Sequence, residues 1–213
     1  LFHPIYQVTR DGKGILQSIE PPQAQGQREL QESFIHCEIV DNTSDELIEA
    51  LKQELPKMID DITKANVDWI AMRTQALSCV KEIEASKFYD SQWAQGQSLV
   101  DFLTWIEDGH FTFLGYCLYS LDAKNTKEPF KRNPSVQPLG ILHNESVYRL
   151  QQLFAGISVS PETMAYIFDP TPVIINKTST ISNVHRTVPM DSIGIRQFDD
   201  KGKVVGIHIF VGL

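Results

Sequence analysis

The sequence predicts an α+β protein in which antiparallel sheets are flanked by helices. Several short apolar stretches alternate with polar residues and are joined by turns rich in Asp, Gly and Lys, a pattern typical of hairpin-linked strands. Three longer segments repeat apolar residues every three or four positions, which predicts amphipathic helices. Because the strands outnumber the helices, we expect helices packed on one face of an antiparallel sheet.

The chain opens with a predicted hairpin over residues 4–20. Its arms are Ile5–Thr9 and Ile15–Ile19, and the Asp-Gly pair in Asp11–Gly14 provides the positive φ that a tight turn needs. After a polar, glutamine-rich loop, Ser33–Val40 predicts a third strand.

Three predicted helices follow. The first begins at a capping box formed by Thr43 and Glu46, and Pro56 inside it predicts a kink or a break. The second covers about Val67–Ala85 and the third about Ser91–Asp108. Their apolar stripes predict packing against a sheet or against each other.

From His110 onward, the apolar period changes from helical to alternating. His110–Leu121 predicts a strong strand, and Asp122–Pro134 predicts a polar loop. The remaining expected elements are a short strand at Gln137–Leu142, a helix at Glu145–Ala155, a helical turn at Ser160–Thr163, and strands at Val173–Lys177, Val184–Phe198 and Lys203–Val211.

Composition and missing motifs exclude several classes of function. The net charge of -8 argues against nucleic acid and anionic membranes as partners. The three cysteines, Cys37, Cys79 and Cys117, are far apart, so we expect reduced thiols and a cytoplasmic location. The sequence has no glycine-rich phosphate motif, no HExxH and no GxSxG. We therefore expect no catalytic residue, cofactor site or metal site in this chain.

One polar cluster, Lys177, His185, Arg186 and Asp191, is a candidate site. Strand alternation over Val184–Ile195 places His185 and Arg186 on opposite faces. Arg186 and Lys177 would bind an anionic ligand or a neighbouring domain, with Asp191 as their counter-ion. The alternative is an internal ion pair and a turn that fixes a bend in the strand.

A hydrolase is a further alternative. It would use Cys117 or Ser182 as the nucleophile and His185 as the base, and it requires these side chains to lie within hydrogen-bond reach. No local motif supports this arrangement.

Several segments resemble the N-terminal region of the large bacterial NAD-specific glutamate dehydrogenases. The matching segments are HPIYQVTRDGKG (His3–Gly14), ESFIHCEI (Glu32–Ile39), HFTFLGY (His110–Tyr116), PLGIL (Pro138–Leu142) and the block from VIINKTS to KVVG (Val173–Gly206). Their order and spacing match as well. Where the family usually reads GE and a basic residue, this chain reads Gly206-Ile207-His208, which argues against a functional polar face on this strand.

The resemblance implies a non-catalytic regulatory or assembly fragment of an enzyme that oxidises L-glutamate to 2-oxoglutarate and ammonia with NAD. It implies an incomplete ACT-like unit at 1–66, connecting helices at 67–108 and a PAS-like sheet domain at 109–213. NAD would bind downstream in the parent chain, which would form homo-oligomers and respond to an amino-acid effector.

The two ends of the sequence fit such a fragment. Leu1 is not an initiator Met, and the sequence ends in the apolar run Ile207–Val211, so we expect a piece of a longer chain. A stand-alone amino-acid or small-molecule sensor is the alternative.

Overall fold

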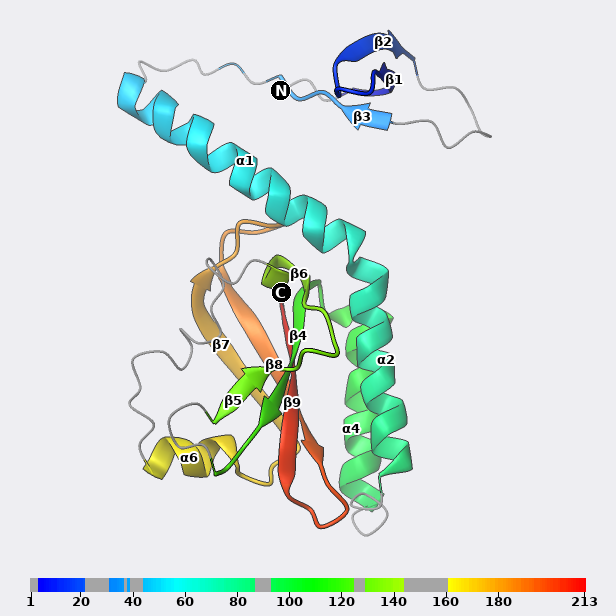
Figure 1. The fold of residues 1–213 in the computed structure, drawn as a ribbon, viewed down its shortest axis with the longest axis vertical. Helices are drawn as coiled ribbons and strands as arrows, with labels where there is room; N and C mark the ends of the chain where they lie inside the picture. Colours follow the sequence, from blue (N-terminus) through cyan, green and yellow to red (C-terminus); the bar gives the residue numbers. More distant parts are fainter. Residues whose placement is uncertain are drawn as a thin grey trace. The chain divides into compact units, whose positions relative to one another are not determined.

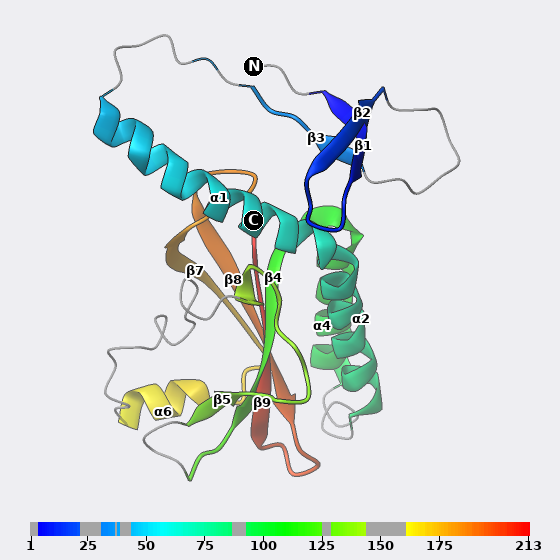
Figure 2. The same cartoon turned by 45° about the horizontal axis from the view of Figure 1, so that its top comes forward.

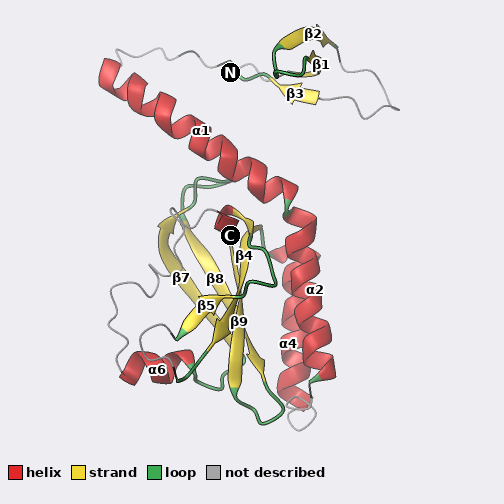
Figure 3. Ribbon diagram, in the orientation of Figure 1, coloured by secondary structure: helices red, strands yellow, loops and turns green. Residues whose placement is uncertain are grey.

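The computed structural model describes residues 4–21, 31–36, 38, 44–86, 93–124, 129–143 and 161–213. The chain divides into two compact units, Leu1–Lys52 and Gln53–Leu213. Each unit contains an antiparallel sheet, and helices make up much of the second (Figure 3). The predicted α+β class with antiparallel sheets is therefore confirmed.

The first unit contains a three-stranded antiparallel sheet in the order β2-β1-β3. It comprises β1 (Ile5–Arg10), β2 (Leu16–Glu20) and β3 (Gln31–Ser33). The predicted hairpin is confirmed, and its turn is fixed by the carboxylate of Asp11, which accepts hydrogen bonds from the backbone N–H groups of Lys13 and Ile15, both at 2.9 Å.

The third strand lies earlier than Ser33–Val40, so that prediction is wrong in its bounds. The register pairs Ser33 with Ile5, the first residue of β1. The preceding residue, Pro4, has no N–H with which to extend the ladder, although its carbonyl still accepts a bond from the Phe34 N–H at 3.0 Å. Residues 37 and 39–43 lie outside the described part of the chain.

Helix α1 (Asp45–Val67) starts directly after Ser44. The Ser44 hydroxyl accepts a bond from the Leu47 N–H at 3.4 Å, as an N-terminal cap does. Thr43 of the predicted capping box lies outside the described residues. The helix runs on through Pro56, so of the kink or break expected there, the break is absent. Proline removes only one hydrogen bond, and the turns on both sides remain helical.

The second unit is built on a sheet in which β5 (Phe130–Arg132), β4 (Phe113–Leu121), β9 (Val204–Gly212), β8 (Pro189–Phe198) and β7 (Val173–Ile181) follow one another. The short β6 (Leu139–Gly140) pairs with β4 and leads into the 3-10 helix η2 (Ile141–His143). All of these pairings are antiparallel.

Helices α2 (Trp69–Ala85) and α4 (Trp93–Trp105) lie side by side along one side of this sheet (Figures 1 and 2). Alternate residues of the central strands, including Tyr116, Ile195 and Phe210, pack with Met72 and Leu103 of the two helices. The strand residues between them, among them Leu114, Met190 and Val211, face the opposite way. They form a second core cluster together with Ala65 of α1 and Ile141 of η2.

Several predicted bounds in the second unit need correction. The strand predicted at Val184–Phe198 begins only at Pro189, because residues 182–188 form a local turn in which His185 has a φ of 66°. Strand β5 lies within the predicted polar loop. The predicted helical turn at Ser160–Thr163 corresponds to α6 (Pro161–Ile167). The helix predicted at Glu145–Ala155 lies outside the described residues.

Candidate functional site

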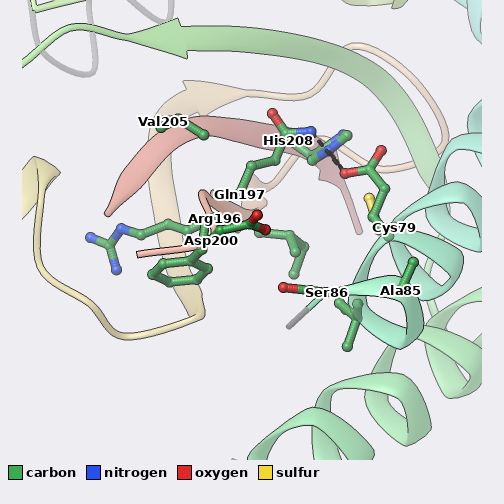
Figure 4. A pocket seen from close by; sticks show the side chains of 12 residues that line it. Cys79, Ala85, Ser86, Arg196, Gln197, Asp200, Val205 and His208 are labelled. Atoms are coloured by element: carbon green, nitrogen blue, oxygen red, sulfur yellow. Dashed lines mark hydrogen bonds and ion pairs between the residues drawn. The ribbon is translucent and has the colours of Figure 1, made fainter. Parts of the chain in front are cut away.

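A pocket of about 380 Å³ lies within the second unit, between the C-terminal end of α2 and strands β8 and β9 (Figure 4). Helix α2 contributes Cys79 and Glu82 to it, and Ser86 follows the helix end. The strands contribute Gln197 and His208. These five residues come from two regions that are far apart in the sequence, the end of α2 and the β8–β9 hairpin.

His208 links this pocket to the interior of the sheet. It is 2% exposed, and its ring lies between two partners. Its Nδ1 is 2.9 Å from the hydroxyl of Tyr116, and its Nε2 is 3.1 Å from Oε2 of Glu82. A carboxylate only accepts hydrogen bonds, so Nε2 carries the proton and donates to Glu82. In the neutral ring Nδ1 then accepts from the Tyr116 hydroxyl.

Glu82 is held from two sides. Besides the bond from His208, its Oε2 accepts a bond from Nε2 of Gln197 at 2.8 Å. These bonds, that from His208 first, lower the pKa of the Glu82 carboxyl below its ordinary value. The close approach of Gln197 depends on Gly206, because a Cβ at that position would lie 2.3 Å from the Gln197 Oε1. The carboxylate is therefore ionised and fixed in place at neutral pH.

The other two reactive groups near the pocket are not activated. Burial, with a further contribution from the charge of Glu82, raises the pKa of the Cys79 thiol. Burial also raises the pKa of the Tyr116 hydroxyl. Cys79 is therefore protonated and lacks the thiolate character of a nucleophile.

Arg196 also lines the pocket, but the carbonyls to which its guanidinium donates belong to residues outside the pocket lining. Figure 4 shows the side chain extending away from Cys79 and His208. Its guanidinium donates to the carbonyls of Tyr166 (2.6 Å), Thr171 (2.5 Å) and Ile167 (3.3 Å). Arg196 thus fixes the end of α6 and the segment after it.

The predicted polar cluster is only partly assembled. Lys177 and Asp191 are cross-strand neighbours, and Nζ of Lys177 is 2.8 Å from Oδ1 of Asp191. His185 and Arg186 are exposed in the turn between β7 and β8 and do not follow strand alternation, so that interpretation is wrong. Within the described residues, no hydrogen bond or ion pair joins their side chains to Lys177 or Asp191.

The hydrolase arrangement finds no support. The Ser182 hydroxyl donates to the carbonyl of Val184 at 2.7 Å and accepts from the same residue's N–H at 3.0 Å. Cys117 is buried in the second core cluster. Among the described residues, no hydrogen bond joins either group to His185.

Sequence reasoning missed the pocket. It treated His208 as a departure from a family pattern, although one signal was present. In the alternating strand Val204–Gly212, His208 shares a face with Phe210, so a polar ring occupies an inward position. A buried histidine of this kind needs polar partners.

Comparisons with known proteins agree with this fold. Residues 1–55 match the family model described as glutamate dehydrogenase, ACT1 domain. Over its full length the chain is 24% identical to the NAD-specific glutamate dehydrogenase of Halomonas elongata. Over 98% of its length it is 26% identical to the enzyme of the same name from Pseudomonas aeruginosa. The resemblance inferred from the motifs is confirmed, and the chain spans 13% of each relative's length.

Two further features bear on partners. Within the described ranges, no helix has the length and apolar character to cross a membrane. In the same part of the chain, no group of His, Cys, Asp and Glu residues is arranged to hold a metal ion.

Proposed function

We propose that this chain is a non-catalytic regulatory and assembly part of an NAD-dependent glutamate dehydrogenase. The parent enzyme would oxidise L-glutamate to 2-oxoglutarate and ammonia, with NAD bound elsewhere in its chain. The observation that carries this proposal is the match along the whole chain to two NAD-specific glutamate dehydrogenases, of which it covers only 13%.

Several features support a non-catalytic role. The sequence lacks a glycine-rich loop for the phosphates of a dinucleotide. The Cys79 thiol is buried, and the His208 ring is engaged by Tyr116 and Glu82. These groups are fixed by neighbouring side chains instead of being positioned to react.

The assembly role rests on the exposed turn between β7 and β8 and on the Lys177–Asp191 ion pair in the two strands beside it. We assign Lys177, His185, Arg186 and Asp191 to a contact with an anionic ligand or with another domain of the parent. Arg186 is exposed, and an arginine fork suits carboxylates and phosphates. The parent would be a cytoplasmic homo-oligomer that responds to an amino acid. The antiparallel sheet β5-β4-β9-β8-β7, whose strands all lie within 109–213, supports a PAS-like domain there.

A stand-alone sensor is the second candidate, because the pocket of about 380 Å³ falls within the size range of small-ligand sites. In that case the chain would bind its ligand without any dehydrogenase being present.

The test compares three proteins in a glutamate-dependent assay of NAD reduction. The full-length protein that carries this chain should be active, and the isolated 213-residue chain should be inactive. A full-length Arg186→Ala variant should keep its melting temperature but show an altered response to amino acids or altered subunit assembly. NADH production by the isolated chain would refute the non-catalytic role, and an inactive full-length protein would refute the assignment of the parent.

A further inference from the structure

We propose that the pocket between α2, β8 and β9 binds a small organic cation, a primary ammonium group on a short aliphatic chain. Glu82 would hold the ammonium group, and the apolar walls of the pocket would cover the chain. This inference concerns binding alone and does not depend on the proposed parent enzyme.

The pocket presents a hydrogen-bond acceptor that is already oriented. Oε2 of Glu82 is occupied by His208 and Gln197, whereas Oε1 makes no hydrogen bond within the described part of the chain. The Glu82 side chain is 47% exposed, so a ligand in the pocket can reach it. Because two donors already fix the carboxylate, an ammonium ion binds without the cost of ordering this side chain.

The charges around the pocket favour a cation. The lining residues include two carboxylates, Glu82 and Asp200, and no lysine. The one arginine among them, Arg196, directs its guanidinium to the carbonyls near α6. An anion in the pocket would therefore face two negative side chains with no free positive group among the lining residues.

The end of α2 adds to this preference. The helix ends at Ala85, which lines the pocket, and its last turn contains no basic residue. The C-terminal end of a helix carries a partial negative charge that stabilises nearby cations. An ammonium ion bound to Glu82 would provide the positive charge that the helix end lacks.

The walls limit the size of the ligand. Ile83, Ile195, Phe198 and Val205 contribute apolar surface. A volume of about 380 Å³ lies near the lower limit for ligand sites, so a short alkyl chain fits better than a bulky ring system. A neutral alcohol of the same length would fill the same space but would lose the charge-assisted bond to Glu82.

The test uses isothermal titration calorimetry of the 213-residue chain at pH 7 with n-butylammonium, butan-1-ol and butyrate. We expect n-butylammonium to bind and the alcohol and the anion to bind at least about tenfold more weakly. The Glu82→Gln variant should weaken n-butylammonium binding by about tenfold or more. Glu84→Gln removes the same charge from an exposed position on α2 that does not line the pocket, and it should leave the affinity unchanged.

A second variant tests the location without touching the hydrogen bonds. Val205 is 42% exposed, so Val205→Phe can be accommodated while its larger side chain fills the pocket, and it should also weaken n-butylammonium binding. Circular dichroism establishes that each variant is folded. The proposal is overturned if n-butylammonium does not bind or if butan-1-ol binds as tightly. It is also overturned if a folded Val205→Phe variant binds n-butylammonium with the same affinity as the unsubstituted chain.

Discussion

Removing the hydroxyl of Tyr116 should destabilise the second unit by about 1–3 kcal/mol, because it leaves Nδ1 of His208 without a donor. Both side chains are buried, Tyr116 at 0% and His208 at 2% exposure, so water cannot replace the lost bond. Tyr116→Phe keeps the ring volume, and the change therefore adds no cavity cost. His208→Leu should cost a similar amount, since it leaves the Tyr116 hydroxyl unpaired in turn.

The double variant distinguishes this explanation from simple loss of packing. The double variant, Tyr116→Phe with His208→Leu, replaces both partners by apolar groups and so leaves neither polar atom of the pair unsatisfied. The sum of the two single losses in unfolding free energy should therefore exceed the loss in the double variant by about 1–2 kcal/mol. Urea unfolding followed by tryptophan fluorescence measures these differences in the second unit, where Trp69 and Trp105 lie. Tyr166→Phe is the matched control, because its hydroxyl accepts one bond at the surface and its loss should cost less than about 0.5 kcal/mol. Additive single and double effects would refute the proposed pairing of Tyr116 with His208.

Three further predictions concern Glu82, Arg196 and Gly206. The folded-state pKa of Glu82 is lowered, so its contribution to stability is present above the ordinary glutamate pKa and is lost as the pH falls through the folded value. The difference in melting temperature between the unsubstituted chain and the Glu82→Gln variant should therefore shrink between pH 7 and about pH 3. A lysine at position 196 cannot reproduce the three carbonyl contacts of Arg196. Arg196→Lys should therefore lower the free energy of unfolding by about 2–4 kcal/mol and speed amide hydrogen exchange in residues 161–171. Unchanged exchange in these residues would contradict this role of Arg196. Gly206→Ala should displace the Gln197 side chain from Glu82. In NMR spectra, the chemical shifts of the Gln197 side-chain amide protons should then move toward the values of a solvent-exposed glutamine.

The strands that sequence reasoning located best, β4 and β9, are buried along most of their length. On one face their residues pack on α2 and α4, and on the other they belong to the second core cluster, so both strands are long apolar runs that stand out in the sequence. The turn at residues 182–188 was missed for a local reason. Ser182 bonds to the backbone of Val184, and this side-chain contact competes with the strand ladder that Val184 and Val188 would otherwise favour.

The pocket could not be predicted because its contacts join distant parts of the chain. Glu82 and His208 are separated by 126 positions, and Tyr116 and His208 by 92. Spacing along one element gives no information about such pairs. The Lys177–Asp191 pair was within reach of prediction, since both residues belong to one hairpin, and the structure pairs them directly. Exposed pairs of this kind contribute only about 0–1 kcal/mol, so finding the pair does not by itself identify a site.

The position of Glu82 gives ligand binding a physical route into the sheet. The carboxylate that would bind an ammonium ion also accepts the proton of His208, and His208 accepts the bond from Tyr116 in the core shared by α2, α4 and the strands. A cation on Oε1 reduces the negative charge available to His208, so the two contacts are energetically linked through one side chain. His208→Leu should therefore change the affinity for n-butylammonium although it leaves Oε1 of Glu82 in place. An unchanged affinity in a folded His208→Leu variant would show that the pocket and the buried network act independently.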